Sequence, residues 1–450
     1  MKKRILALLL MGVMVCTALT GCGTKTDAPA ASGNPETAET VALNVTTTFA
    51  GEDGNAQNFQ DAVKEWEEQT GNTVNDSSAT SDETFKARVT ADFEMGSEPD
   101  VLFYFNGVDS NSFVESGKVV SIDEIRKEYP EYASNMKDEM MGASPVDGKN
   151  YSVPVNGYWE AMFVNTAVLE QAGVEVPGAD YTWDQFLTDC QKIKDAGFAP
   201  IAAALGNIPH YWFEFSIFNH LNTATHCQIP ESVEDANGKA WVAGMEDIKM
   251  LYEKGYFPEN TLSGTDDETF QLFMNDKAAF LIDGSWKVGG IVSNCQSDPE
   301  DPATLDQAKL DKFTVTYVPG NGERKATDLI GGLSMGYYIS KKAWDDPAKR
   351  AAAVDFVEHM TSDEKVAEFA QHTASALKEA PKVDEASFNS LQLKAMEMTA
   401  GVTSLAPAVQ DLILPENRTP LFDAGMPKIV TGKTAAKDAV QECLDLIAGK

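Results

Sequence analysis

The sequence is poor in basic residues relative to acidic ones. Its 450 residues include 36 lysines and arginines against 69 aspartates and glutamates, which gives a formal net charge of −33. A surface of this sign repels phosphate backbones and anionic lipid headgroups, so we expect no nucleic-acid binding. The acidity indicates solubility rather than a specific cation partner.

Cysteine and histidine are sparse and widely spaced. After the N-terminal segment the chain contains Cys190, Cys227, Cys295 and Cys443, with no Cys-x-x-Cys pair. His210, His220 and His226 precede Cys227, but they form no i, i+4 histidine pair and lack the close Cys/His spacing of a zinc site. We therefore predict no metal site and no cofactor. Disulfide pairing stays open, because the spacing matches no known framework.

Long apolar runs are absent except at the N-terminus. Ile5 to Leu19 follows three basic residues and has the length of a signal-peptide core, too short to span a bilayer comfortably. It ends at Leu19-Thr20-Gly21-Cys22, which resembles the bacterial lipobox, where cleavage before the cysteine leaves a lipid-modified thiol. We expect residues 1–21 to be a signal peptide and Cys22 to anchor the mature chain at the extracellular face of the cytoplasmic membrane.

The segment that follows lacks aromatic and branched aliphatic residues. Residues 22–40 consist mostly of Ala, Thr, Gly, Pro, Ser and a few charges, and such a composition cannot bury a core. We expect a flexible tether that lifts the folded body, residues 41–450, off the membrane. The length of that body suits two domains.

Hydrophobic periodicity in the body predicts an α/β fold. Residues 41–49 alternate as a strand, Phe59, Val63 and Trp66 mark a helix face, and a second helix ends at Gly96 before an apolar strand at 100–105. This β-α-β-α-β order is the start of a doubly wound sheet. Capping boxes are predicted at Thr80-Ser81-Asp82-Glu83, Thr182…Gln185, Thr265…Glu268 and Thr361…Glu364, and the stripe at Trp241, Met245, Ile248 and Leu251 is predicted to pack in a core.

Several segments, in order, resemble the extracellular solute-binding protein family that serves sugar importers. They are Gly96-Ser97-Glu98-Pro99-Asp100-Val101, Tyr151-Ser152-Val153-Pro154, Phe163-Val164-Asn165, Thr182-Trp183, the strand Ala278 to Ile282 ending in Asp283-Gly284-Ser285-Trp286, and Gly331-Gly332 with Ile339-Ser340-Lys341. The chain departs from the family pattern at Ala179-Asp180-Tyr181, which is inserted before Thr182. The resemblance covers nearly the whole mature chain.

The resemblance implies two doubly wound lobes of the type II periplasmic-binding-protein kind that close over a ligand in a cleft. We place the first lobe at 41–153 plus about 287–340 and the second at 154–286 plus about 341–450. The implied ligand is a sugar or oligosaccharide, the implied partners are the transmembrane subunits of an ABC permease, and no catalysis is implied.

Sugar capture requires flat apolar faces against pyranose C–H groups and planar polar groups for hydroxyls. Strand ends and the loops after them supply such groups in α/β lobes. The candidate ligand-binding residues are therefore Phe105, Asn106, Asp109, Trp159, Glu160, Trp212, Glu214, Asp283 and Trp286, with Gly331 and Gly332 allowing close backbone approach. The stretch at 210–214 could equally be a buried helix.

Other classes of function remain as alternatives. A surface glycoside hydrolase could use Glu160 and Asp283 as its paired carboxylates, although only their abundance in an acidic chain suggests it. A binding protein for a metal or polyamine, or a lipoprotein that acts only as adhesin or scaffold, would lack sugar selectivity. Recovery of an intact ligand and a thermal-shift screen would separate these classes.

Overall fold

The protein is described by a computed structural model that covers residues 40–450 except 52, 300, 372, 380–387 and 423. The expected signal peptide, Cys22 and the tether up to residue 39 lie outside the described residues. Within the described part of the chain, no helix combines the length and apolarity needed to cross a membrane.

The first sheet has five strands in the order β2-β1-β3-β10-β4. They are β1 (Ala42–Thr46), β2 (Thr73–Asp76), β3 (Val101–Phe105), β4 (Ser152–Val153) and β10 (Met335–Ile339). β1 pairs in parallel with β2 and β3, whereas β10 runs antiparallel to both β3 and β4. The predicted β-α-β-α-β start is confirmed, and β10 joins it from far along the chain.

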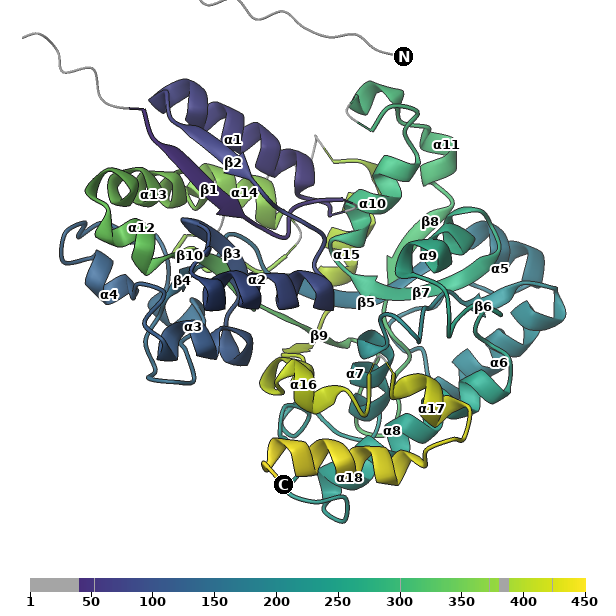
Figure 1. The fold of residues 1–450 in the computed structure, drawn as a ribbon. Helices are drawn as coiled ribbons and strands as arrows, with labels where there is room; N and C mark the ends of the chain where they lie inside the picture. Colours follow the sequence, from purple (N-terminus) through teal and green to yellow (C-terminus); the bar gives the residue numbers. More distant parts are fainter. Residues whose placement is uncertain (1–39, 52, 300, 372, 380–387, 423) are drawn as a thin grey trace, which may run out of the picture. The chain divides into compact units, whose positions relative to one another are not determined.

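Helices from two distant parts of the sequence cover this sheet. They are α1 (Ala56–Thr70), α2 (Glu83–Met95), α3 (Asn111–Glu115), α4 (Ile122–Ile125), α12 (Lys341–Asp345), α13 (Pro347–Met360) and α14 (Asp363–Ala370), with 3-10 turns η1 (Gly107–Ser110) and η2 (Asp138–Met140). α13 packs against α1 and β1 (Figure 1). Trp66 of α1 lies edge-on to Phe356 of α13, with 5.1 Å between ring centroids. The predicted face of α1 is buried, and α1 ends at Gly71 in the left-handed region. We call this unit the first lobe.

The second sheet has the order β11-β9-β5-β7-β6, with β8 also paired to β5. Its strands are β5 (Tyr158–Asn165), β6 (Ala199–Ile201), β7 (Ala278–Gly284), β8 (Phe313–Thr316), β9 (Asp328–Gly332) and β11 (Ser404–Ala406). β5 runs antiparallel to β7, β8 and β9. β7 is buried along its whole length, as its near-continuous apolar run requires.

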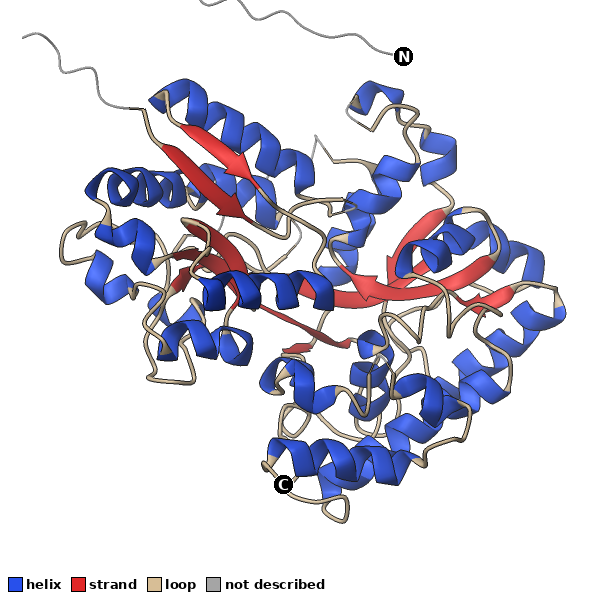
Figure 2. Cartoon of the chain, viewed as in Figure 1, coloured by secondary structure: helices blue, strands red, loops and turns tan. Residues whose placement is uncertain are grey.

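The second sheet and its helices form the second lobe, and Figure 2 shows helices packed around these strands. They are α5 (Thr166–Ala172), α6 (Trp183–Asp195), α7 (His210–Phe218), α8 (Ala236–Glu253), α9 (Asp266–Met274), α10 (Lys287–Asn294), α11 (Gln307–Leu310), α15 (Ser390–Ala400), α16 (Pro415–Arg418), α17 (Met426–Val430) and α18 (Ala436–Ile447), with η3 (Pro302–Thr304) and η5 (Val409–Leu412). The stripe at Trp241, Met245, Ile248 and Leu251 on α8 is fully buried, so its predicted core role is confirmed.

Two of the four predicted capping boxes are present and two are replaced by a neighbouring cap. Thr182 with Gln185 and Thr265 with Glu268 make both reciprocal hydrogen bonds. α2 is capped instead by Asp82, whose carboxylate accepts from Phe85 N–H, and α14 by Ser362. In both corrected cases a side-chain oxygen closer to the first turn reaches the amide of the third helical residue.

The hydrophobic cores divide the second half of the chain differently from the expected lobe boundaries. Residues 287–330 contribute to the second core, because β8 and β9 pair with β5. Residues 337–377 contribute to the first core, because β10 pairs with β3 and α13 packs on β1. The chain therefore passes between the cores between Val155 and Tyr158, again between Gly332 and Met335, and again after Leu377.

The question left open for the four cysteines is answered by their positions. Cys190, Cys227, Cys295 and Cys443 are all free thiols. Burial raises the pKa of the Cys227 and Cys443 thiols to about 12 each, so both are protonated and unreactive at neutral pH.

Candidate functional site

Three aromatic side chains of the second lobe gather where β5 and β7 meet. Trp286, just after β7, lies 6.3 Å between ring centroids from both Tyr158 of β5 and Tyr211 of α7. Register places the start of β5 beside the end of β7, with Glu160 opposite Gly284. A Cβ at Gly284 would overlap the Trp286 ring, so the Gly-Ser-Trp sequence lets the indole fold back over the strand.

Two buried carboxyl groups lie next to these rings. Asp283 is fully buried and forms an ion pair with Lys287 at 3.3 Å, while Lys287 also contacts Asp266 at 2.8 Å. The charge of Asp283 adds to the burial that raises the pKa of the Tyr211 hydroxyl well above its usual range. Glu160 is 2% exposed, and its Oε2 has no hydrogen-bond partner among the residues that the structure describes. Burial, followed by repulsion from Glu214, Asp411 and Asp283, holds the pKa of Glu160 well above its usual range.

Charged and aromatic groups of the first lobe face the second lobe here. Lys86 of α2 pairs with Asp109 of η1 at 2.9 Å and lies 4.2 Å from the centroid of the Phe105 ring. η1 packs against η5 of the second lobe, and Gly107 stands next to the Asp411 carbonyl. Residues from both lobes therefore meet, and we call the set Tyr158, Glu160, Tyr211, Asp283, Trp286, Asp411, Lys86 and Asp109 the inter-lobe site.

Burial shifts the pKa of two further groups where the two lobes meet. It raises the pKa of Asp411 to about 7, an effect that Lys86 opposes and Asp109 reinforces. It lowers the pKa of His210 to about 3, with further depression by Arg418 and Lys86, so this imidazole is neutral at physiological pH. Because Lys86 influences both groups, the α2 side of the first lobe lies within electrostatic range of α7 and η5.

The short turn η5 is held in place by hydrogen bonds to a buried carboxylate. Glu214 of α7 is fully buried and accepts hydrogen bonds from the backbone N–H of Val409 at 3.1 Å and of Gln410 at 2.9 Å. His226 Nε2 lies 2.8 Å from the same carboxylate. Arg418 donates to the Gln410 carbonyl at 2.8 Å. Glu214 therefore acts on the site by positioning the turn that bears Asp411.

Several residues predicted to contact ligand are placed in packing roles. Trp212 is 2% exposed and packs against Phe186 and Phe257, so it belongs to the second core. Trp159 is also buried and packs on Phe163, on the opposite side of β5 from its neighbour Tyr158. The helix and strand periods put these rings on the core face, while the adjacent residues Tyr211 and Tyr158 take the site face.

The glycine pair and Asn106 also have structural roles, in strand pairing, backbone conformation and hydrogen bonding within a lobe. A Cβ at Gly331 would lie 2.6 Å from the Tyr158 carbonyl, so this glycine permits β9 to pair with β5. Gly332 has a φ of 152°, which favours glycine where the chain leaves β9. Asn106 donates to the Met141 carbonyl at 3.5 Å within the first lobe. Phe105, Asp109, Glu160, Asp283 and Trp286 are the predicted residues that gather at or beside the inter-lobe site.

Sequence reasoning missed Tyr158, Tyr211, Lys86 and Asp411, and it also missed Asp53. The aromatic stretch that begins at His210 did signal the site, but without a known helix phase it gave no way to choose between Tyr211 and Trp212. Asp53 is half-buried in the loop before α1, and burial raises its pKa to about 7 despite a hydrogen bond from Asn55 N–H. Its neighbour Gly54 packs against Gly289 of α10, which brings that loop to the second lobe.

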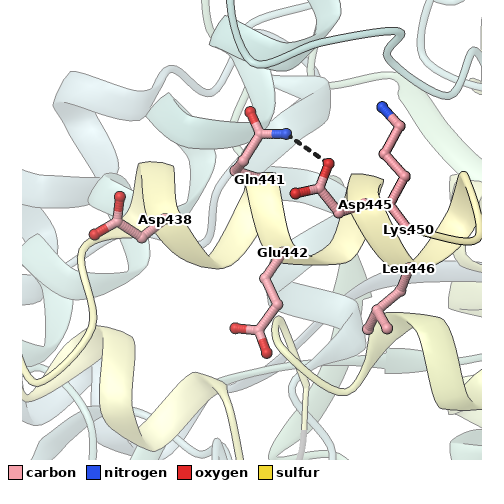
Figure 3. A pocket seen from close by; sticks show the side chains of 6 residues that line it. All are labelled: Asp438, Gln441, Glu442, Asp445, Leu446 and Lys450. Carbon is pink, nitrogen blue, oxygen red and sulfur yellow. Dashed lines mark hydrogen bonds between the residues drawn. The ribbon is translucent and has the colours of Figure 1, made fainter.

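Two hollows are present, one remote from the inter-lobe site and one that borders it at Tyr158. One of about 470 Å³ is lined by residues of α18 and the chain end, and Figure 3 shows their side chains diverging except for a hydrogen bond from Gln441 to Asp445. The other, of about 560 Å³, lies beside the crossing strands and is bordered by Tyr158, Trp159, Ala374 and Leu405 among others. Among the residues that the structure describes, no three His, Cys, Asp or Glu side chains are arranged to hold a metal ion.

A comparison with known protein families identifies the family to which this chain belongs. The family model described as bacterial extracellular solute-binding protein matches residues 61–390, which is more than half of the chain. The protein therefore belongs to the bacterial extracellular solute-binding protein family, and the resemblance read from the sequence is confirmed.

The individual proteins to which this chain is similar share only a low sequence identity with it. A multiple sugar-binding protein of Streptococcus mutans is 25% identical over 177 residues, and the match spans 38% of this chain and 40% of the relative's length. Among solved structures, a chitin oligosaccharide binding protein superposes with a TM-score of 0.75 at 21% identity over 91% of this chain and 99% of that one. An ABC substrate-binding protein of Listeria monocytogenes in complex with cycloalternan gives 0.67 at 18% over 91% and 99%. These superpositions confirm the expected two-lobed type II fold.

Proposed function

We propose that the protein is a lipid-anchored extracellular receptor that captures a carbohydrate between its two lobes and delivers it to the membrane subunits of an ABC importer. The observation that carries this proposal is the aromatic group of Tyr158, Tyr211 and Trp286 beside the carboxyl groups of Glu160 and Asp283. Flat rings suit the C–H faces of pyranoses, and carboxyl groups suit their hydroxyls.

The proposed ligand contacts combine both lobes. From the sequence-based set we retain Phe105, Asp109, Glu160, Asp283 and Trp286, and we add Tyr158, Tyr211, Lys86 and Asp411. The family membership and the sugar-binding relatives named above support a carbohydrate, and the family also supports an extracellular location and an import permease as partner.

The lipid anchor rests on the Leu19-Thr20-Gly21-Cys22 sequence. Replacing Cys22 with alanine removes the thiol that would carry the lipid. We expect the Cys22→Ala protein to move from the membrane fraction to the culture medium, as seen by immunoblotting of the two fractions, with a Cys227→Ala protein as the matched control that stays membrane-bound. Retention of both variants at the membrane would exclude anchoring through Cys22.

We propose binding without catalysis. A glycoside hydrolase that used Glu160 and Asp283 would need one carboxylate free to act as base or nucleophile, whereas Asp283 is held in an ion pair with Lys287 at 3.3 Å. Burial raises the pKa of both carboxyl groups, and in Glu160 the neighbouring acids reinforce the shift. This favours the role of hydrogen-bonding groups for a ligand that is released unchanged.

A thermal-shift screen of the protein against mono- and oligosaccharides, amino acids, polyamines and divalent metals tests the function. We expect one saccharide class to raise the unfolding midpoint by several degrees, because a ligand that binds only the folded state stabilises it. The saccharide should then be recovered chemically intact after prolonged incubation. Stabilisation only by a metal or polyamine, or cleavage of the sugar, would contradict the proposed function.

A further inference from the structure

We propose that Gly54 of the first lobe and Gly289 of the second lobe form the contact that limits how closely the two lobes approach, so that any side chain at position 289 holds them apart and weakens saccharide binding. The inference rests on the proposed function, because it concerns how the two lobes enclose the saccharide. Three observations lead to it: the closeness of the two backbones, the position of Gly289 within a helix, and a looser second contact between the lobes.

The first observation is that the lobes meet backbone to backbone at these two glycines. A Cβ added to Gly289 would overlap Gly54 Cα and lie 3.1 Å from Gly54 N. A Cβ added to Gly54 would lie 3.1 Å from the Trp286 carbonyl oxygen and 3.3 Å from Gly289 N. The obstacle at position 289 is backbone and not the end of a flexible side chain. It can therefore be relieved only if the loop that bears Gly54 moves away.

Neither side of this contact can retreat without moving its lobe. The loop is fixed to the first lobe by Asn55, whose backbone N–H donates to Asp53 Oδ1 at 2.8 Å and whose Nδ2 donates to the Phe369 carbonyl of α14 at 3.2 Å. α10 is fixed to the second lobe by Val288 and Ile291, which are 3% and 0% exposed in the second core. A wedge between the loop and α10 therefore separates the lobes themselves.

The second observation is that the backbone at position 289 does not itself require a glycine. Gly289 is the third residue of α10 and has the negative φ of a helical residue, which any L-amino acid adopts. In a helix, glycine is among the least favourable residues and alanine is the most favourable. The glycine therefore weakens α10, and the close approach of Gly54 explains why it is there.

The third observation is a second contact between the lobes that leaves more room. η1 packs against η5, and a Cβ added to Gly107 would lie 3.6 Å from the Asp411 carbonyl oxygen, an ordinary van der Waals distance. Gly107 is explained by its φ of 81°, which favours glycine without any contact. Of the two contacts, the one between Gly54 and Gly289 is the tighter, so it is the one that stops further approach.

The position of this contact links it to the inter-lobe site. Trp286, whose ring lies beside Tyr158 and Tyr211, is the residue immediately before α10, and its carbonyl oxygen is part of the contact. A side chain at 289 would therefore move the first lobe away from the aromatic wall without altering any group of that wall. Affinity should fall because the conformation that binds the saccharide from both lobes becomes less populated.

The test measures lobe separation and affinity independently in the detergent-solubilised full-length protein. Spin labels are attached at Glu68→Cys on α1 and Ala308→Cys on α11, both exposed, in a Cys227→Ser background. Their separation is measured by electron paramagnetic resonance with and without the saccharide that gives the largest thermal shift. With glycine at 289 the saccharide should shorten the separation. In Gly289→Ala the separation should stay measurably longer, and the affinity measured by calorimetry should fall at least about tenfold.

A size series and a matched control sharpen the result. Gly289→Gln carries a longer side chain that is also a good helix former, and its affinity should fall at least about 100-fold. Gly178→Ala introduces the same methyl group at an exposed glycine of the second lobe, 3.5 Å from Asp180 Oδ1, and should keep affinity within about twofold. Without saccharide, the unfolding midpoints of both 289 variants should equal or exceed that of the unaltered protein, because both residues suit a helix better than glycine.

The outcomes separate this inference from the proposed function. Unaltered affinity in Gly289→Ala and Gly289→Gln would overturn the inference and leave saccharide capture standing. So would a loss of affinity with the label separation shortening as it does in the unaltered protein, or a loss that follows a lowered unfolding midpoint. If the unaltered protein bound no saccharide, the proposed function would be wrong and the inference with it.

Discussion

Replacing Trp286 with alanine is expected to weaken saccharide binding by about 100-fold or more, because the largest flat surface of the inter-lobe site disappears. The indole is half-buried at the edge of the second core, lies close to Tyr158 and Tyr211, and rests over Gly284. A loss of this size corresponds to roughly 3 kcal/mol, in the range of a buried aromatic contact. Titration calorimetry with the saccharide that gives the largest thermal shift measures it.

Two companion variants make the Trp286 result interpretable. Trp286→Phe keeps a smaller ring and should lose about tenfold at most. Tyr252→Ala removes a half-buried aromatic from α8, outside the inter-lobe site, and should leave affinity within about twofold. If Trp286→Ala bound the sugar within threefold of the unaltered protein, stacking at this position would be excluded.

Replacing Glu214 with alanine is expected to cost stability and binding together. The carboxylate satisfies the backbone N–H groups of Val409 and Gln410 and pairs with His226, all within a site that is fully buried. Its removal leaves these donors without partners, so the free energy of unfolding should fall by roughly 3 kcal/mol. Because η5 bears Asp411, saccharide affinity should fall as well, by about tenfold or more. Urea denaturation and calorimetry measure the two effects.

Glu214→Gln distinguishes a positioning role from direct ligand contact. The amide oxygen can still accept from one backbone N–H, so the loss of stability should be about half that of the alanine variant. Its affinity should recover in step with its stability. A Glu214→Gln protein with unaltered stability but lost affinity would show instead that Glu214 contacts the ligand.

Most of the fold could be predicted from local sequence, because the signals that define it are local. The α1 face at Phe59, Val63 and Trp66, the left-handed ends at Gly71 and Gly96, and the capping boxes at Thr182 and Thr265 are each decided within a few residues. The misplaced cap at Thr80 shows the limit of this reasoning. Asp82 offers an equivalent oxygen two residues later, and sequence spacing alone does not rank the two.

Lobe membership in the second half of the chain depends on long-range pairing and could not be predicted locally. β10 belongs to the first sheet because Tyr337 and its neighbours pair with β3, more than two hundred residues earlier. β8 and β9, which precede it, pair with β5 instead. All three strands look alike in sequence, as short apolar segments, so nothing local assigned residues 287–340 to one lobe or the other.

The proposed inter-lobe site draws on the segments that the sequence indicated, but not always on the residue named there. Strand-end logic located Asp283 and Trp286 after β7 and Asp109 after β3. Trp159 and Trp212, which the sequence named, pack in the second core, whereas their neighbours Tyr158 and Tyr211 lie at the inter-lobe site, because adjacent residues on a strand or helix face different ways. Asp411 gave no signal, since its turn is placed by Glu214 from a distant helix.

The repeated passage of the chain between the two cores has a consequence for the order in which the molecule can assemble. As the polypeptide is delivered from its N-terminus, the first sheet stays without its β10 strand until residue 339 has emerged. The second core still lacks α17 and α18 until nearly the whole chain is present. The first lobe can therefore finish folding only after residue 377 has emerged, and the second lobe only when nearly the whole chain has been delivered.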